Sequence, residues 1–126
     1  MPTVDLTADT FDTTVTDNDI VLLDFWADWC GPCKTFGPIY EEVSSNHDDI
    51  VFGKVDTEQE QALAAQFGIQ SIPTLAVIRE QVVVFAQPGV VPAEALEDLI
   101  NQVRDLDMEE VKRDAKPGAS PDTPEG

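Results

Sequence analysis

Basic residues are scarce in this chain of 126 residues, which has 7 lysines and arginines against 25 aspartates and glutamates. The resulting net charge of −18 would repel the phosphate backbone of nucleic acids, so we expect no nucleic-acid binding. Attraction to an anionic membrane surface is disfavoured for the same reason. The hydrophobic fraction of 42% nevertheless predicts a globular chain, with a length that suits one domain.

Cysteine is equally scarce, with two residues, and long apolar runs are absent. Two cysteines cannot staple a small secreted framework, and no apolar stretch approaches the ~20 residues of a membrane helix. Residues 1–5 contain neither a basic region nor an apolar run, so we expect no secretory signal peptide. We therefore expect a soluble cytoplasmic protein. In a reducing compartment, a Cys-x-x-Cys pair is typically catalytic or metal-binding rather than structural.

The hydrophobic pattern alternates between strand and helix periods. Strands are predicted at 3–6, 20–26, 50–55, 74–78 and 82–85, and helices at 9–15, after Cys33, at about 57–68 and from Pro92 to Leu106. Thr57 and Glu60 are interpreted as a capping box at the start of the third helix, which Gly68 would end. The order β-α-β-α-β-α-β-β-α predicts an α/β fold, in which helices cover a mixed sheet.

The composition changes from about Asp107. Residues 107–126 contain prolines, glycines and a serine, with almost no apolar side chains. Such a segment cannot offset the entropy lost on ordering. We therefore expect a folded domain at residues 1–106 and a disordered acidic tail at residues 107–126.

The two cysteines lie in the segment Trp29-Cys30-Gly31-Pro32-Cys33, between a buried strand and a helix. Residues three apart on a first helical turn share one face, and their spacing suits a small disulfide ring. At the helix N-terminus, unpaired N–H groups and the helix dipole favour a thiolate at Cys30. We predict that Cys30 is the nucleophile in disulfide exchange and that Cys33, shielded one turn further in, is the resolving thiol.

Zinc binding is the alternative for such a pair, but a structural zinc site needs four ligands. The chain can add only its single histidine, His47, so we expect no metal site. We interpret His47, which stands between Asn46 and Asp48, as a solvated surface residue.

Asp24 is a further candidate, because it interrupts an otherwise apolar run of residues at 20–26. A buried carboxylate without a partner has a raised pKa. Placed six residues before Cys30, it could exchange a proton with Cys33 through water. It could also pair with Lys54, which strand alternation places on the buried side, and the two roles are compatible.

Together these residues resemble the thioredoxin family. The similarity covers about residues 3–106 and rests on the run from Asp24 to Lys34, followed by Pro38, Lys54, Phe67-Gly68-Ile69, Ile72-Pro73-Thr74 and Gly89. A Trp-Cys-Gly-Pro-Cys motif with an aspartate upstream and Ile-Pro-Thr downstream is highly specific. The resemblance implies a thioredoxin fold, with a central mixed sheet of about five strands flanked by four helices.

The resemblance also implies a function, a monomeric cytosolic reductase of protein disulfides that binds no cofactor. A flavin-containing, NADPH-dependent thioredoxin reductase would restore its dithiol. The Gly-Pro dipeptide between the cysteines is similar to that of reducing members of the family. A cis peptide bond before Pro73 would place that loop beside Cys30. An apolar patch would then receive an extended substrate chain, and its implied residues are Trp29, Gly31, Pro32, Ser71, Ile72, Pro73 and Gly89.

Three positions depart from the family pattern. Arg79-Glu80-Gln81 replaces the usual Asn-Gly turn, and because these residues do not readily adopt positive φ we expect a longer turn. Gln70 stands where a basic residue is common, and Pro88 precedes Gly89. Two other functions remain open. One is a binding or assembly module that uses the same patch without turnover, and the other is a peroxidase of related fold, whose additional elements this chain lacks.

Overall fold

Five strands form one mixed sheet in the order β1-β3-β2-β4-β5. The computed structural model describes residues 3–114. Its elements are β1 (Thr3–Asp5), α1 (Ala8–Asp17), β2 (Ile20–Trp26), α2 (Gly31–Ser44), β3 (Val51–Asp56), α3 (Gln61–Gln66), β4 (Thr74–Arg79), β5 (Val82–Pro88), α4 (Ala93–Arg104) and α5 (Met108–Asp114). Strands β1, β3 and β2 run parallel, whereas β4 is antiparallel to both β2 and β5. The mixed five-stranded sheet expected from the sequence is confirmed.

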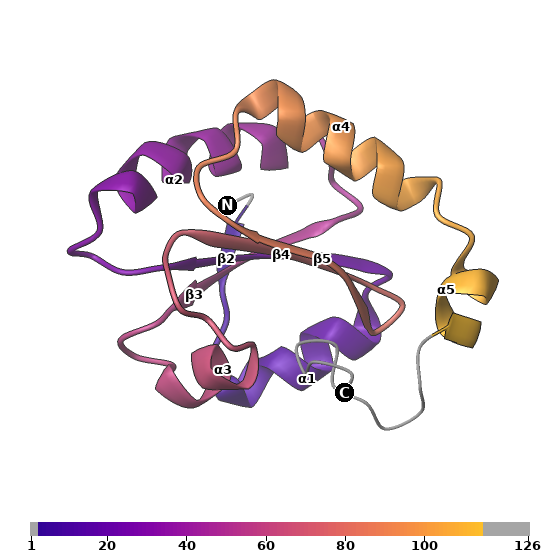
Figure 1. Ribbon diagram of the computed structural model, residues 1–126, viewed down its shortest axis with the longest axis horizontal. Helices are drawn as coiled ribbons and strands as arrows, with labels where there is room; N and C mark the ends of the chain where they lie inside the picture. Colours follow the sequence, from indigo (N-terminus) through magenta and orange to yellow (C-terminus); the bar gives the residue numbers. More distant parts are fainter. Residues whose placement is uncertain (1–2, 115–126) are drawn as a thin grey trace.

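Helices cover both faces of this sheet (Figure 1). Helices α2 and α4 lie on one face, and α1 and α3 lie on the other. These are the four expected helices, and the short helix α5 is a fifth that the sequence did not predict. Within residues 3–114, no helix combines the length and the apolar character needed to cross a membrane.

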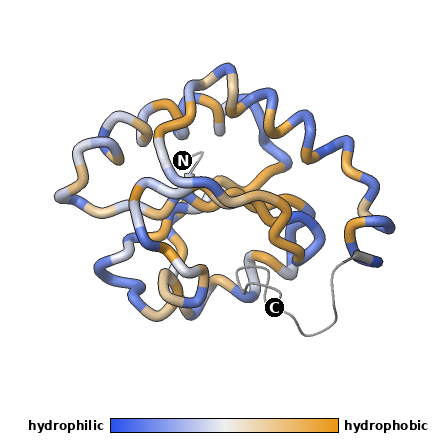
Figure 2. Tube along the Cα trace, viewed as in Figure 1, coloured by the Kyte–Doolittle hydropathy of each residue, from blue (hydrophilic) through white to orange (hydrophobic). Residues whose placement is uncertain are grey.

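Strand β2 is the centre of the fold, and six of its seven residues are buried. Leu22 belongs to the core between the sheet and helices α2 and α4, whereas Leu23 faces the core on the side of α1 and α3. Figure 2 shows hydrophobic residues concentrated along the sheet and on the inner sides of the helices. Because both faces of β2 are covered, its sequence is a continuous apolar run rather than an alternating one.

The sheet topology brings three chain segments to one edge. Strand β2 ends at Trp26, and the cysteine motif follows it directly. Because β4 runs antiparallel to β2, the first residue of β4, Thr74, pairs with Phe25 near the end of β2. Strand β3 runs parallel to β2, so that its last residue, Asp56, pairs with Trp26. The segment before Thr74 and the segment after Asp56 therefore flank the cysteines.

The hairpin between β4 and β5 is tighter than the sequence predicted. Arg79 pairs directly with Val82, which leaves Glu80 and Gln81 as a two-residue turn. Both residues have positive φ, 51° and 70°, as a type I′ turn requires. The expected longer turn was wrong, because contacts outside the turn favour the strained conformation. The Glu80 N–H donates to the carbonyl of Asp19 at 2.8 Å, and the Glu80 carboxylate lies 2.6 Å from Lys112 Nζ.

Gln81→Gly is expected to raise the free energy of unfolding by about 0.5–1 kcal/mol. Glycine removes the cost of placing a Cβ atom at positive φ, and part of that gain is lost to the greater freedom of glycine in the unfolded chain. Chemical denaturation of the variant and of Gln81→Ala measures the effect. Gln81→Ala keeps the Cβ atom and should gain nothing, and equal stability of the two variants would contradict this account.

The start of α3 also differs from the prediction. The residue at the N-cap position is Glu60, and its side chain makes no capping hydrogen bond. The Thr57 hydroxyl donates instead to the carbonyl of Trp26 at 3.0 Å, and Glu60 Oε1 accepts a hydrogen bond from the N–H of Ala8 at 2.9 Å. The capping box was therefore wrong, since both side chains bind other elements. The predicted end of α3 is confirmed, because Gly68 follows the last turn with φ 65°.

Helix α5 occupies part of the segment that we expected to be disordered. Its first residue, Met108, is 8% exposed. Lys112 of α5 forms the ion pair with Glu80 at the hairpin. Nearby, Arg79 Nη1 donates to the carbonyls of Val103 and Leu106 at 2.7 and 3.2 Å, which places the guanidinium at the C-terminal end of α4. The buried Met108 side chain and the Lys112–Glu80 ion pair thus hold α5 in place, although its composition is mostly polar. Residues 115–126 of the expected tail lie outside the described residues.

Candidate active site

The two cysteines form a disulfide at the first turn of α2. Cys30 is the N-cap residue of this helix, and the Cα atoms of Cys30 and Cys33 lie 5.3 Å apart. The N–H of Cys33 donates to Cys30 Sγ at 3.1 Å. This N–H is one of the helix's unpaired donors, so it would stabilise a negative charge on the same sulfur after reduction. The sequence prediction that places Cys30 at the helix N-terminus is confirmed.

The two sulfurs differ in their neighbours rather than in their exposure. Cys30 is 3% and Cys33 is 5% exposed, so the shielding predicted for Cys33 applies equally to Cys30 while the disulfide is closed. Cys30 Sγ lies 3.7 Å from the carbonyl oxygen of Ile72. Cys33 instead lines a pocket of about 370 Å³ on the other side, together with Gly37 and Lys54. Cys30 thus faces the segment before β4, and Cys33 faces the pocket that Lys54 also lines.

Asp24 is buried in β2 with 1% of its surface exposed. Neither of its carboxylate oxygens has a hydrogen-bond partner among the described residues. Burial raises the pKa of Asp24 from 3.8 to about 6, and the positive charge of Lys54 opposes part of that rise. At neutral pH the carboxylate is therefore largely ionised, with a pKa close enough to neutrality for proton exchange.

Lys54 stands next to Asp24 in the sheet register but forms no direct ion pair with it within the described residues. Its ammonium lies 5.1 Å from the centre of the Trp26 ring, and it lines the same pocket as Cys33. The indole Nε1 of Trp26 is buried without a hydrogen-bond partner in the described part of the chain. The expected pairing of Asp24 with Lys54 was wrong as a direct contact, because the two residues are only register neighbours and Lys54 acts on the carboxylate through its charge.

The segment before β4 lies beside the cysteines, and its Ile72–Pro73 peptide bond is cis. The N–H of Gly89, at the end of β5, donates to the carbonyl of Pro73 at 2.8 Å. Gly89 has φ 108°, a value that favours glycine at this junction. Ser71 and Gly89 are exposed, Ile72 is half-buried and Pro73 is buried. The structure thus brings together Cys30 and the segments that carry Ser71, Ile72, Pro73 and Gly89.

Exposed apolar residues surround the disulfide. Trp29 is 69% exposed, and Gly31 and Pro32 are exposed at the first turn of α2. Val90, which follows Gly89 in the chain, is a further exposed apolar residue, at 39%. Sequence reasoning missed Val90, although its place beside Gly89 in the chain was an available signal. This surface could hold an apolar segment of another polypeptide against Cys30.

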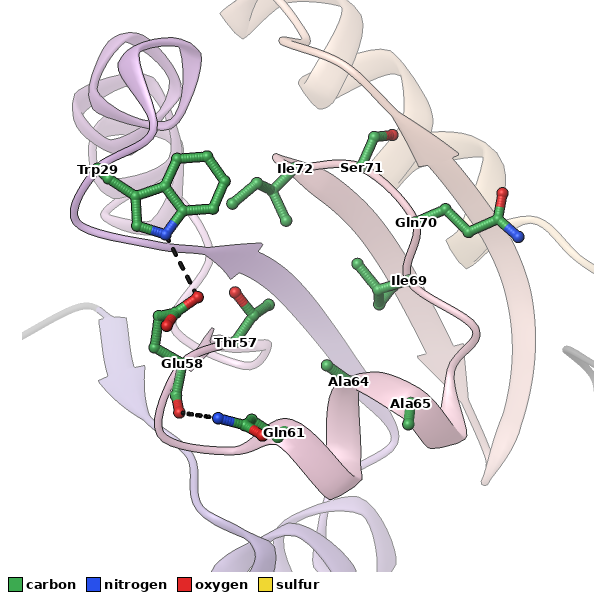
Figure 3. A pocket seen from close by; sticks show the side chains of 10 residues that line it. All are labelled: Trp29, Thr57, Glu58, Gln61, Ala64, Ala65, Ile69, Gln70, Ser71 and Ile72. Atoms are coloured by element: carbon green, nitrogen blue, oxygen red, sulfur yellow. Dashed lines mark hydrogen bonds between the residues drawn. The ribbon is translucent and has the colours of Figure 1, made fainter.

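Glu58 is a second residue that sequence reasoning missed. The Trp29 indole Nε1–H donates to Glu58 Oε2 at 3.3 Å, as Figure 3 shows. The two residues are 29 positions apart, and no spacing pattern in the chain links them. Their contact follows from the sheet register, which places the segment after β3 beside the segment after β2.

His47 lies away from the cysteines, and its interpretation as a solvated residue was wrong. Its side chain is 13% exposed, lies against α4 and stacks on the ring of Phe52 with the ring centres 6.3 Å apart. His47 Nε2 lies 2.6 Å from Glu97 Oε1, and Arg104 Nη2 donates to His47 Nδ1 at 3.2 Å. Within residues 3–114, no group of three or more His, Cys, Asp or Glu side chains could hold a metal ion.

Comparison with known proteins gives one consistent result. The family model described as Thioredoxin matches residues 2–102. The chain is 62% identical over 111 residues to "Putative thioredoxin 2" of Streptomyces coelicolor, a match that covers 88% of this chain and 83% of that protein. It is 42% identical over 88 residues to "Thioredoxin" of Bacillus subtilis, covering 69% and 85%. Among solved structures, a mutant thioredoxin from Halobacterium salinarum superposes with a TM-score of 0.77 at 34% identity, covering 83% of this chain and 94% of that one.

Proposed function

The chain belongs to the thioredoxin family, and we propose that it reduces the disulfides of cytoplasmic proteins with Cys30 as the nucleophile. Its activity is that of a thiol–disulfide oxidoreductase, as the family and the Cys30–Cys33 pair indicate. The observation that carries the proposal is the position of this pair. It stands at a helix N-terminus, beside the Ile72–Pro73 segment and within an exposed apolar surface.

In the first step, the Cys30 thiolate attacks one sulfur of a substrate disulfide. A bond forms between Cys30 Sγ and that sulfur, the substrate S–S bond breaks, and the other substrate sulfur leaves as a thiolate. The N–H of Cys33, 3.1 Å from Cys30 Sγ, supports the proposal that Cys30 is the thiolate in the reduced protein.

In the second step, Cys33 attacks Cys30 and closes the protein's own disulfide. The mixed disulfide breaks, so that the substrate leaves with both sulfurs reduced and the protein holds one more disulfide. Cys33 must lose its proton to attack, and we assign the acceptor role to Asp24, through water. The pKa of about 6 and the lack of a competing hydrogen bond at the Asp24 carboxylate, within the described residues, support this role.

The surface around Cys30 positions the substrate. Ser71, Ile72 and Pro73 would lie along an extended substrate chain, and their backbone would supply hydrogen bonds. Gly89 supports this segment through its hydrogen bond to the carbonyl of Pro73. The apolar contacts would come from Trp29, Gly31 and Pro32.

A thioredoxin reductase would return the protein to its dithiol form with electrons from NADPH. This role is proposed because exchange consumes the Cys30–Cys33 dithiol, and continued turnover needs an external reductant. No prosthetic group is required in this chain, since the two sulfurs hold both electrons. The protein is proposed to act as a monomer, one chain carrying a complete site.

The reduction potential tests the direction of the reaction. We expect a value near the about −270 mV commonly given for thioredoxins, whereas an oxidant of this fold lies near about −120 mV. Equilibration with glutathione buffers of graded composition, followed by thiol alkylation and mass measurement, gives the potential. A value above about −200 mV would contradict a reducing role.

A further inference from the structure

A second pocket, of about 560 Å³, opens next to Cys30 on the Trp29 side. Figure 3 shows Trp29 and Glu58 on one side of it, α3 on another and the segment before β4 opposite. Ile72 joins this pocket to the reacting sulfur, because its side chain lines the pocket while its carbonyl lies 3.7 Å from Cys30 Sγ. A side chain of the polypeptide that presents a disulfide to Cys30 can therefore reach this pocket.

The walls of this pocket are apolar, but one end is acidic. Ala64, Ile69 and Ile72 contribute apolar surface. Glu58 contributes a carboxylate, of which Oε2 accepts from Trp29 and Oε1 has no hydrogen-bond partner in the described part of the chain. Asp56 lies directly behind it, because its Oδ1 accepts from the N–H of Glu58 at 2.9 Å. The end of the pocket at Glu58 thus carries one carboxylate, and the Asp56 carboxylate, which does not itself line the pocket, adds a second negative charge behind it.

Within residues 3–114, the protein supplies no positive charge to pair with Glu58 at this end of the pocket. The lining residues include no lysine or arginine. Glu58 takes part in no ion pair within residues 3–114, and Lys54 lies over Trp26 in the pocket of Cys33. The Glu58 carboxylate is consequently available to a cation supplied by a partner, in a protein whose net charge is −18.

We propose that this pocket binds an arginine side chain of the substrate polypeptide, located about two residues from the reacting cysteine. The inference rests on the proposed reductase function and names a feature of its substrates. In an extended chain, side chains two residues apart point the same way and lie about 6.6 Å apart, which suits a pocket adjoining the sulfur site.

Arginine fits the chemistry of the pocket better than lysine does. The arginine methylene groups match the apolar walls, and the planar guanidinium can stack on the exposed indole of Trp29 while it donates to Glu58. The side-chain oxygens of Gln61 and Gln70, which also line the pocket, are further acceptors. Lysine offers a compact charge without a plane to stack.

Single-turnover kinetics with synthetic peptides test this specificity. Each peptide carries one cysteine, activated as a mixed disulfide with thionitrobenzoate, and differs at the position two residues away, which is arginine, norleucine, glutamine or glutamate. The reduced protein attacks each peptide at low ionic strength, and the released chromophore gives the rate. We expect the arginine peptide to react about tenfold faster than the glutamine peptide, and the glutamate peptide to react slowest.

Glu58→Gln keeps an acceptor for Trp29 but removes the charge. In this variant, the ratio of arginine to glutamine rates should fall to about two or less. Glu42→Gln, which removes one exposed charge on α2 outside the pocket, is the matched control and should keep the wild-type ratio. Equal rates for the arginine and glutamine peptides in the wild-type protein, or a preference for norleucine, would overturn this inference and leave the reductase function intact. Failure to attack any peptide would contradict the reductase function itself.

Discussion

Cys33→Ser is expected to stop the protein at the mixed disulfide with its substrate. Serine cannot attack the bond between Cys30 and the substrate sulfur, so the second step is blocked after the first has occurred. Steady-state reduction of a protein disulfide should fall by about 10³-fold or more. Non-reducing electrophoresis should show a covalent adduct in about one-to-one ratio, and peptide mapping should place it at Cys30.

Cys30→Ser is the matched variant for this experiment. It removes the nucleophile and leaves Cys33 in place, so we expect neither turnover nor an adduct of comparable yield. If Cys30→Ser formed the adduct and Cys33→Ser did not, the assignment of the two cysteines would be reversed. If the wild-type protein and Cys30→Ser were equally inert, the alternative of a binding module without turnover would be favoured.

Asp24→Asn is expected to stabilise the folded protein by about 3 kcal/mol at pH 8. The carboxylate is buried without a hydrogen-bond partner among residues 3–114, and folding raises its pKa from 3.8 to about 6. Ionised Asp24 therefore destabilises the native state above that pKa, whereas an amide carries no charge to desolvate. Denaturant unfolding of the two proteins, both with the disulfide closed, measures the difference.

The direction of the Asp24 pKa shift determines how the stability difference between Asp24→Asn and the wild-type protein changes with pH. Because the folded pKa is higher than the unfolded pKa, the native state binds a proton more tightly, and the stability contributed by protonated Asp24 is complete below about pH 4. That stability is lost as pH rises through about 6. The difference between Asp24→Asn and the wild-type protein should thus be small at pH 4 and grow to its full value by pH 7–8. Asp98→Asn, an exposed change on α4, should show no such pH dependence, and a constant difference for Asp24→Asn would contradict the raised pKa.

Asp24→Asn should also slow the second chemical step while it stabilises the fold. Loss of the proton acceptor is expected to lower the rate of mixed-disulfide resolution by on the order of tenfold near neutral pH, because buffer can still accept the Cys33 proton. Addition of a small external base should restore part of the rate. An unchanged resolution rate would contradict the proton-transfer role and leave the stability argument intact.

Local patterns predicted most of the fold and the centre of the site. The apolar run of β2 identified the central strand, and the interruption at Asp24 identified a buried carboxylate, because both faces of that strand are covered. The three-residue spacing of Cys30 and Cys33 was sufficient to predict a disulfide at a helix start. These features depend on neighbours within a few residues, which a sequence displays directly.

The features that were not predicted depend on contacts between distant segments. Thr57 matches the sequence pattern of a capping box, but its hydroxyl donates to the carbonyl of Trp26 instead. Glu80 adopts positive φ while it contacts Asp19 and Lys112. His47 looked solvated because its sequence neighbours are polar, yet α4 covers it. In each case a tertiary partner changed the outcome of a local preference, and no local pattern names that partner.

The contact of Glu58 with Trp29 has the same origin. It arises where the ends of β2 and β3 meet at one edge of the sheet, so the register must be known before the two residues can be associated. Sequence reasoning located the reacting cysteines, whereas the sheet topology was needed to locate the pocket beside them.

A single-turnover transfer tests the central claim most directly. The protein is first reduced, freed of small thiols and then mixed with a protein that contains one exposed disulfide, and the reaction is quenched with acid. Mass spectrometry of both partners should show one substrate disulfide reduced for each Cys30–Cys33 disulfide formed, with no transfer by Cys30→Ser. Loss of the substrate disulfide without formation of the Cys30–Cys33 disulfide, or equal transfer by Cys30→Ser, would contradict the account.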